Sequence, residues 1–137
     1  MDETISIVLF SGTDDKLQSA AVLAGGAAAL GKPVKILLQY WALEAFRADR
    51  IKADHGLVAE AGDAGRAALD AHAKSGGAHW SDTMRTAKEI GEIDIQACSL
   101  SMDVLKLKQA DLDSLVDGVE GVAAFLINAG EGQILFI

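Results

Sequence analysis

Cys98 is the only cysteine in this chain of 137 residues, and it directly follows the apolar run IDIQA at residues 93–97. The next segment has the apolar spacing of a helix at residues 102–107. A cysteine between a strand and a helix lies where free amides and the positive end of the helix dipole favour a thiolate over a thiol. The position therefore predicts a nucleophilic sulfur, and a buried thiol that faces the core is the alternative.

Two hydroxyl groups follow the thiol closely in the sequence. Ser99 and Ser101 can cap the start of the helix, or they can donate hydrogen bonds to a negative sulfur species. Capping is the favoured role, and the two roles are compatible. We therefore include both serines among the candidate site residues.

Two further groups of candidate residues follow the first two apolar runs of the chain. Gly12 and Thr13 come after the first run, and Tyr40 and Trp41 come after the second. Because the carboxyl ends of parallel strands meet at one edge of a sheet, we expect these residues to converge on Cys98. Gly12 and Thr13 would bind an anion through amide and hydroxyl groups, and the aromatic pair would roof the site. Burial of the aromatic pair in an interface is the alternative.

The spacing of the three histidines does not predict a metal site. His72 and His79 are separated by six residues, whereas zinc-binding histidine pairs are separated by about three to five. We expect neither a metal nor a cofactor. His79 is a candidate proton donor for Cys98, and a surface or interface position for it and for His55 and His72 is the alternative.

Composition and charge argue against several classes of protein. The net charge is −8 and no basic stripe is present, so we do not expect a nucleic-acid partner. A single cysteine cannot form an intrachain disulfide. The acidic start MDETISIVLF is unlike a signal peptide, and the longest apolar stretch, residues 20–30, is shorter than the roughly 20 residues needed to cross a bilayer. We therefore expect a cytoplasmic protein without a membrane span.

Apolar runs alternate with helix-forming segments along the whole chain. The expected strands are residues 5–10, 34–39, 93–97, 116–119 and 134–137. The expected helices are residues 15–30, 43–46, 57–74, 81–90, 102–107, 109–115 and 122–128. This alternation predicts one α/β domain over residues 1–137, an open three-layer sandwich whose mostly parallel sheet has about five strands and helices on both faces.

In residues 11–43, a SGTDDK turn precedes an Ala-rich helix, and the next strand ends in Tyr-Trp. In residues 97–137, the segments ACSLSMD, DGVEGVA and LFI follow one another in this order. With these motifs, the two parts of the chain resemble the DsrE/DsrF-like family of sulfur-relay proteins, especially the branch labelled peroxiredoxin-like. Residues 50–80 depart from that branch, because they are Ala-rich and contain the histidines where it has a Gly/Met-rich stretch.

The resemblance implies a small cytoplasmic homo-oligomer that carries sulfur as a persulfide on Cys98. Such a carrier, possessing sulfurtransferase-like activity, would take the outer sulfur of a donor and pass it to an acceptor, each a protein or a small thiol. Two other hypotheses stay open at this point. The strand-end pocket could bind a small molecule or anion without covalent chemistry, or the chain could be a structural subunit of an oligomer.

Overall fold

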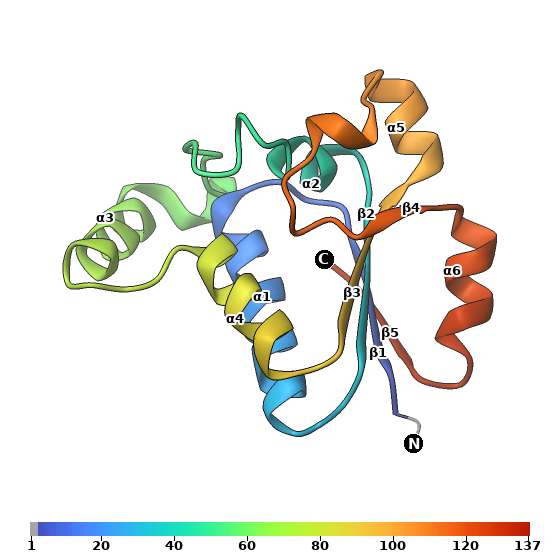
Figure 1. The fold of residues 1–137 in the computed structure, drawn as a ribbon. Coiled ribbons are helices and arrows are strands. Elements are labelled where there is room, and N and C mark those ends of the chain that lie inside the picture. The colour runs from blue at the N-terminus through green and yellow to red at the C-terminus, as the bar shows by residue number, and fades with distance from the viewer. Residues whose placement is uncertain (1–2) are drawn as a thin grey trace.

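All five expected strands form one sheet in the computed structural model, which describes residues 3–137 (Figure 1). The strands are β1 (Ile5–Leu9), β2 (Val34–Leu38), β3 (Ile93–Cys98), β4 (Gly118–Glu120) and β5 (Gln133–Phe136). Every neighbouring pair is parallel, and the strand order is β4-β3-β2-β1-β5. The predicted α/β fold with a mostly parallel sheet is confirmed.

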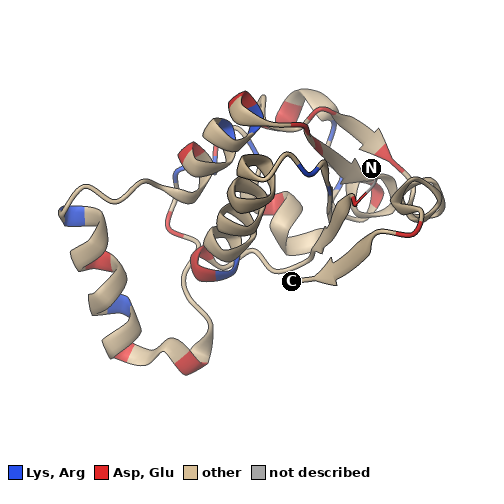
Figure 2. Ribbon diagram, turned by 90° about the horizontal axis from the view of Figure 1, so that it is seen from below, with Lys and Arg blue, Asp and Glu red and all other residues tan. Residues whose placement is uncertain are grey.

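The helices cover both faces of this sheet. They are α1 (Asp14–Ala29), α2 (Tyr40–Ala45), α3 (Gly62–Lys74), α4 (Trp80–Ile90), α5 (Ser99–Leu105) and α6 (Val122–Ala129), with short 3-10 turns at Ala59–Ala61 and Gln109–Asp111. Figure 1 shows α1 and α4 on one face and α6 on the other. Figure 2, seen from below, shows that α3 projects from the side of the molecule. None of the helices between residues 3 and 137 is long and apolar enough to cross a membrane.

The topology explains why α6 lies alone on its face. From β1 to β4 the chain steps across the sheet in one direction, and then it returns from β4 at one edge to β5 at the other. A crossover between parallel strands is almost always right-handed, so reversing the direction of travel moves the connecting helix to the opposite face. The returning segment contains one eight-residue helix, and this face is therefore covered thinly.

The main core lies between the sheet and the pair α1 and α4. Alternate strand residues point into it, among them Ile7, Ile36 and Ile95, which share one register row and are fully buried. The side of α1 that meets them is built from small residues, so the helix approaches closely, as its sequence predicts. Its buried residues are Leu17, Ala20, Ala21, Ala24, Ala27 and Ala28.

A second and much smaller core lies under α6. It consists of Leu37, Cys98 and Phe125, with Val8 packed against them. Within α6 only Phe125 and Ala129 are buried. This helix is therefore attached to the sheet by few apolar contacts, which is a property of segments that open locally at low free-energy cost.

Two expected helices are shorter in the structure. The helix expected over residues 109–115 is only the 3-10 turn at Gln109–Asp111. Asp111 and Asp113 use their carboxylates to accept backbone N–H groups of Lys108 and Leu115, which competes with helical hydrogen bonds. The helix expected over 57–74 begins only at Gly62. Its first residues are instead held at the start of α1, where Val58 donates to the Asp15 carboxylate.

The elements at the carboxyl edge also begin at different residues from those expected. α2 begins at Tyr40 rather than residue 43, and α5 begins at Ser99 rather than residue 102. β4 begins at Gly118, because the Asp117 carboxylate takes the N–H of Ile95 at 2.8 Å before regular pairing starts. α5 thus starts directly after the last residue of β3, and α2 starts one residue beyond the end of β2.

Candidate functional site

Cys98 is the last residue of β3 and the N-cap residue of α5. The prediction that the thiol lies at a strand end and a helix start is confirmed. Its side chain points away from the main core and packs with Leu37, Phe125 and Val8 under α6. Only 1% of Cys98 is exposed, so the thiol is covered rather than open to the strand-end edge.

Gln39 and Glu120 flank Cys98 across the sheet. Leu38, the last residue of β2, pairs with Ala97, and Glu120 of β4 pairs with Cys98. Gln39 directly follows Leu38, so it is level with Cys98 and on the same face. The Gln39 side-chain nitrogen Nε2 donates to Cys98 Sγ at 3.9 Å. The thiol therefore has the Gln39 amide on one side and β4, which contains Glu120, on the other, although its packing contacts are apolar.

The Glu120 carboxylate is held at only one of its oxygens. Oε2 accepts a hydrogen bond from Asn128 Nδ2 of α6 at 3.0 Å. Oε1 is buried, and among residues 3–137 it has no hydrogen-bond partner. Buried polar atoms nearly always have such a partner, so this oxygen is an exception, and it belongs to the residue that pairs with Cys98 in the sheet register.

The two serines have different surroundings. Ser101 is fully buried, and its Oγ accepts the N–H of Tyr40 at 3.1 Å, which fixes the start of α2 against α5. Tyr40 needs this support because its φ of 40° is in the left-handed region. Ser99 is exposed. Neither serine caps α5, because Cys98 itself occupies the N-cap position and no side chain there accepts a cap hydrogen bond.

Gly12, Thr13 and Trp41 line a cavity to which Cys98 does not contribute. This cavity has a volume of about 390 Å³, and its other lining residues are Ser11, Glu44, Ala45, Arg50, Asp54 and His55. The β1–α1 turn leads to the α1 face of the sheet, whereas Cys98 points to the α6 face. The strand ends therefore share an edge, as expected, but the candidate residues divide between two faces.

Glycine at position 12 allows a close approach to the Trp41 backbone that a larger residue would prevent. A Cβ atom on Gly12 would lie 2.2 Å from the backbone oxygen of Trp41. The β1–α1 turn therefore touches the main chain of α2. This contact gives a reason for glycine that does not involve an anion.

The aromatic pair continues a row of rings along the carboxyl edge. Tyr40 lies between Phe10 and Trp41, with ring centroids 5.7 and 6.0 Å away, and Phe10 in turn contacts Phe136. Among the described residues, neither ring belongs to the apolar cluster around Cys98. Trp41 is 54% exposed and borders the Gly12 cavity.

His79 lies away from the thiol, at the N-cap of α4. Its Nδ1 accepts the N–H of Ser81 at 3.1 Å. Burial lowers the pKa of His79, and the positive charge of Lys52 lowers it further. The ring lines a cavity of about 410 Å³ beside α3, together with Asp14 and Trp80 but without any residue around Cys98. The structure thus gives no support for His79 as a proton donor to the thiol.

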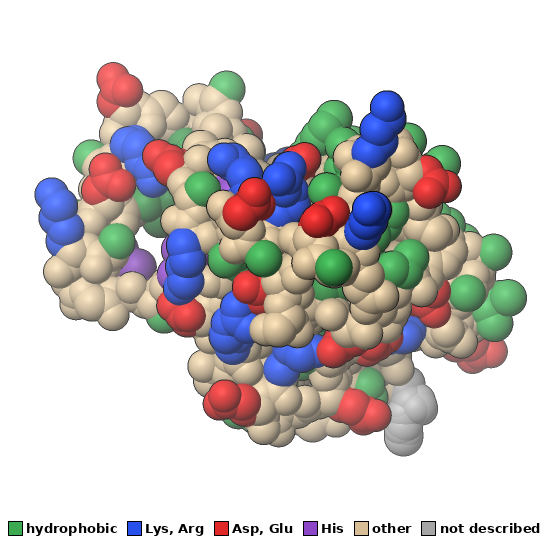
Figure 3. Space-filling model, turned by 45° about the horizontal axis from the view of Figure 1, so that its top comes forward, with side chains coloured by type: hydrophobic (Ala, Val, Ile, Leu, Met, Phe, Trp, Pro, Cys, Tyr) green, Lys and Arg blue, Asp and Glu red, His purple; other side chains and the backbone are tan. Residues whose placement is uncertain are grey.

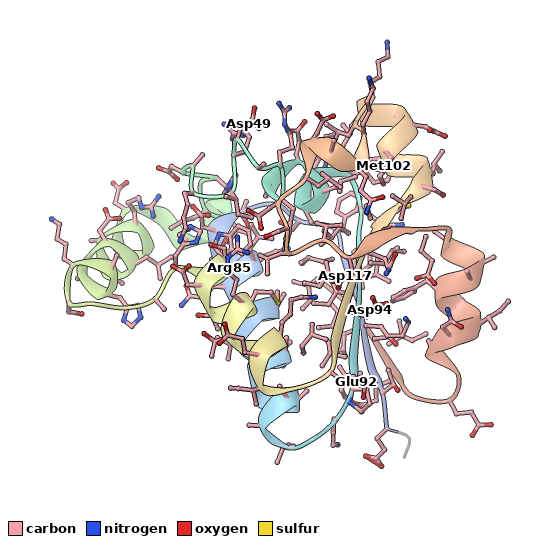
Figure 4. All side chains as sticks on the ribbon, in the orientation of Figure 1. Asp49, Arg85, Glu92, Asp94, Met102 and Asp117 are labelled. Carbon is pink, nitrogen blue, oxygen red and sulfur yellow. The ribbon has the colours of Figure 1, made fainter. Side chains whose placement is uncertain are left out.

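An ion pair also lies on the α6 face, nearer the start of β3 than the thiol. Lys35 and Asp94 share a register row, and their side chains form an ion pair at 3.0 Å. Burial raises the pKa of Asp94, but hydrogen bonds from Gln96 and Lys35 outweigh it, and the pKa is lowered overall. Figure 4 labels Asp94 on β3 and Met102 on α5 above it. No group of three metal-ligating side chains is found between residues 3 and 137.

Sequence reasoning missed Gln39, which donates to the thiol, Phe125, which packs on it, and Glu120, which pairs with Cys98 in the sheet register. A signal for two of them is present, because each polar residue stands at the carboxyl end of an expected strand. Strand periodicity also assigns the face: Ile93, Ile95 and Ala97 alternate with Asp94, Gln96 and Cys98.

Comparison with solved structures supports the fold class. The structure is similar to that of protein MTH1491 from Methanobacterium thermoautotrophicum, with a TM-score of 0.61 and 10% identity over 99% of this chain and 100% of that one. It is also similar to the ychN protein of E. coli, with a TM-score of 0.60 and 12% identity over 100% of both chains. At these identities the likeness concerns the fold alone.

Comparison of sequences identifies the family. The model of the DsrE/DsrF/DrsH-like family matches residues 1–62 and 61–137, so the chain belongs to this family. The sequence is also similar to the protein YrkE of Bacillus subtilis (strain 168), with 30% identity over 154 aligned positions, 96% of this chain and 95% of that protein. The resemblance seen at residues 11–43 and 97–137 thus extends along the whole chain.

Proposed function

We propose that this protein is a sulfur carrier that holds sulfane sulfur as a persulfide on Cys98. Family membership supports a role in sulfur relay. The observation that carries the finer proposal is the position of the thiol, at the end of β3 and the start of α5 with an amide donor directed at Sγ. Amide N–H groups and the start of a helix favour a negative sulfur atom, and both the thiolate and the persulfide anion are negative.

The transfer would proceed by thiol–persulfide exchange. The Cys98 sulfur attacks the outer sulfur of a donor persulfide R–S–SH, the S–S bond of the donor breaks, and R–SH leaves with the proton that Cys98 loses. The products are Cys98–S–SH and R–SH. An acceptor thiol then attacks the outer sulfur of Cys98–S–SH in the same way, which restores the Cys98 thiol.

Access to the thiol requires movement of its cover. Phe125 is fully buried against Cys98, and it belongs to an eight-residue helix with only two buried side chains. The outer surface of α6 is apolar: Ile127 is 78% exposed, and Leu126 and Val122 are also exposed. Figure 3 shows hydrophobic side chains at the end of the molecule where α6 lies. A partner protein or a second copy of the chain that packs on α6 would bury this surface and could displace the cover.

Mass spectrometry of the intact protein tests the proposal. Incubation with polysulfide or thiosulfate is expected to add the mass of one sulfur atom, and a reductant should remove it. Because Cys98 is the only cysteine, Cys98→Ser removes every thiol and serves as the control. Absence of the adduct, or its persistence in Cys98→Ser, contradicts persulfide formation on this residue.

A second candidate function is noncovalent binding of a small anion in the Gly12 cavity. Among residues 3–137, the Arg50 side chain forms no ion pair, whereas the lining carboxylates of Glu44 and Asp54 pair with Arg47 and Arg66. The Nε2 atom of His55 is buried, and it has no hydrogen-bond partner in the part of the chain that the structure describes. Arg50 is therefore the uncompensated charge in a cavity that also contains the hydroxyl groups of Ser11 and Thr13.

Thermal shift measurements with phosphate, sulfate and thiosulfate distinguish the two functions. Noncovalent binding predicts stabilisation that Cys98→Ala leaves intact and Arg50→Gln abolishes. If neither wild type nor Cys98→Ala is stabilised by these ions, this second candidate is wrong.

A further inference from the structure

We infer that Glu120 is the proton acceptor for Cys98 when its sulfur attacks. The inference rests on the proposed function, since it assigns the group that removes the proton in the exchange described above. Glu120 pairs with Cys98 in the sheet register, and both side chains are on the face covered by α6. A carboxylate is therefore one strand away from the thiol, about 5 Å between backbones.

The unbonded oxygen of Glu120 carries the argument. Oε1 is buried and has no donor among the described residues, whereas Oε2 is bonded to Asn128. Oε1 therefore has a free acceptor position that a proton donor on this face can occupy. Cys98 pairs with Glu120 in the sheet register, and its thiol is a proton donor on this face.

Few other charges face this pair. β1, β5 and α6 contain no charged residue, and β2 contributes only Lys35, which is paired with Asp94 of β3. α5 contributes Asp103, which is exposed. Glu120 is thus the charged group at the carboxyl end of the face, and no competing base is present there among residues 3–137.

No hydrogen bond joins Oε1 to Sγ in the resting arrangement, so a side-chain rotation must bring the two atoms together. Because both oxygens belong to one planar carboxylate, this rotation also bends or breaks the single hydrogen bond from Asn128 to Oε2. As the Cys98 sulfur attacks the outer sulfur of R–S–SH, its proton passes to Oε1, and the S–S bond of the donor breaks. Glu120 then gives the proton to the leaving R–S⁻. The carboxylate is regenerated, and no oxidant or reductant is consumed.

The test compares the rate of Cys98 alkylation by iodoacetamide in wild type, Glu120→Gln, Glu120→Asp and Asp103→Asn. Alkylation does not require persulfide formation, so a failure of sulfur loading in wild type would contradict the proposed function and leave this test intact. Asp103→Asn is the matched control, because it removes an exposed carboxylate elsewhere on the same side.

If Glu120 accepts the proton, Glu120→Gln is alkylated about tenfold more slowly near pH 6.5 and at nearly the wild-type rate near pH 9.5, where hydroxide forms the thiolate directly. Glu120→Asp recovers part of the rate, and Asp103→Asn leaves it unchanged. Two results overturn the inference. An equal or faster rate in Glu120→Gln means that the carboxylate only repels the thiolate, and an equal change at every pH means that it only supports the fold.

Discussion

Gln39 Nε2 lies 3.9 Å from Cys98 Sγ and donates to it from the neighbouring strand. The contact joins the carboxyl ends of β2 and β3 on the face covered by α6, where Cys98 also packs against the apolar side chains of Leu37, Phe125 and Val8. A hydrogen bond to a charged acceptor is stronger than one to a neutral acceptor. The amide therefore stabilises the thiolate more than it stabilises the thiol.

Replacing Gln39 with leucine should slow the reactions of Cys98. A net hydrogen bond of about 1 kcal/mol corresponds to roughly a fivefold lower rate of alkylation at neutral pH. Gln96→Leu is the matched control, because that amide donates to Asp94 rather than to the sulfur. Equal rates in the two variants would show that the Gln39 contact does not influence the thiolate.

Removal of the Phe125 ring should expose the thiol. Phe125 is fully buried against Cys98, so Phe125→Ala leaves a cavity and costs about 3–5 kcal/mol of stability, measured by urea unfolding. Because the ring is the cover that α6 provides, alkylation of Cys98 should be at least tenfold faster than in wild type. Leu126→Ala, an exposed change on the same helix, should alter neither quantity. If alkylation is unchanged in Phe125→Ala, reagents reach the thiol by another route.

Gly12→Ala should destabilise the protein, because the new Cβ would lie 2.2 Å from the Trp41 backbone oxygen. Relief requires the β1–α1 turn or α2 to shift, and overpacking of this kind costs on the order of 1–3 kcal/mol. Gly26→Ala is the control, since Gly26 is an exposed residue of α1 with no atom within 4 Å of the new Cβ. That change should stabilise the helix by roughly 0.5–1 kcal/mol. If Gly12→Ala and wild type had equal free energies of unfolding in urea, the turn would shift without a loss of stability.

The fold could be predicted from the sequence because its determinants are local. Apolar runs such as residues 5–10 and 34–39 specify buried strands, and the small residues of α1 specify close packing on the sheet. Two of the errors occur where side chains bond to distant backbone groups. Asp117 takes the N–H of Ile95, and Asp15 takes that of Val58, and neither pairing is encoded by periodicity.

The site could be predicted only in part, because it depends both on the edge of the sheet and on the face of the sheet where each residue lies. Position along the chain places Gly12, Trp41 and Cys98 at one edge of the sheet, and this part was predictable. The face depends on the alternation of strand residues, which assigns Cys98 to the side of Gln96 and away from Ala97. Glu120 depends in addition on the pairing of β3 with β4, whose strand of three residues has little sequence signal.

Stability should fall as the pH drops below the ordinary histidine range, because of His79. Burial and then Lys52 lower the pKa of this ring in the folded state, while the unfolded chain keeps the ordinary value of about 6.5. Between the two values the unfolded state binds more protons. The contribution of His79 is therefore fully present above about pH 6.5 and is lost as the pH falls through that value towards the folded pKa.

Urea unfolding between about pH 7.5 and pH 5 measures this effect, since carboxylates titrate mostly at lower pH. His79→Asn should flatten the dependence on pH while keeping the start of α4, because asparagine is a good N-cap residue and can accept the Ser81 N–H in place of Nδ1. His72→Gln, a change at an exposed histidine, should leave the slope as in wild type. If the free energy of unfolding of His79→Asn depended on pH as steeply as that of wild type, the pH dependence would belong to another group.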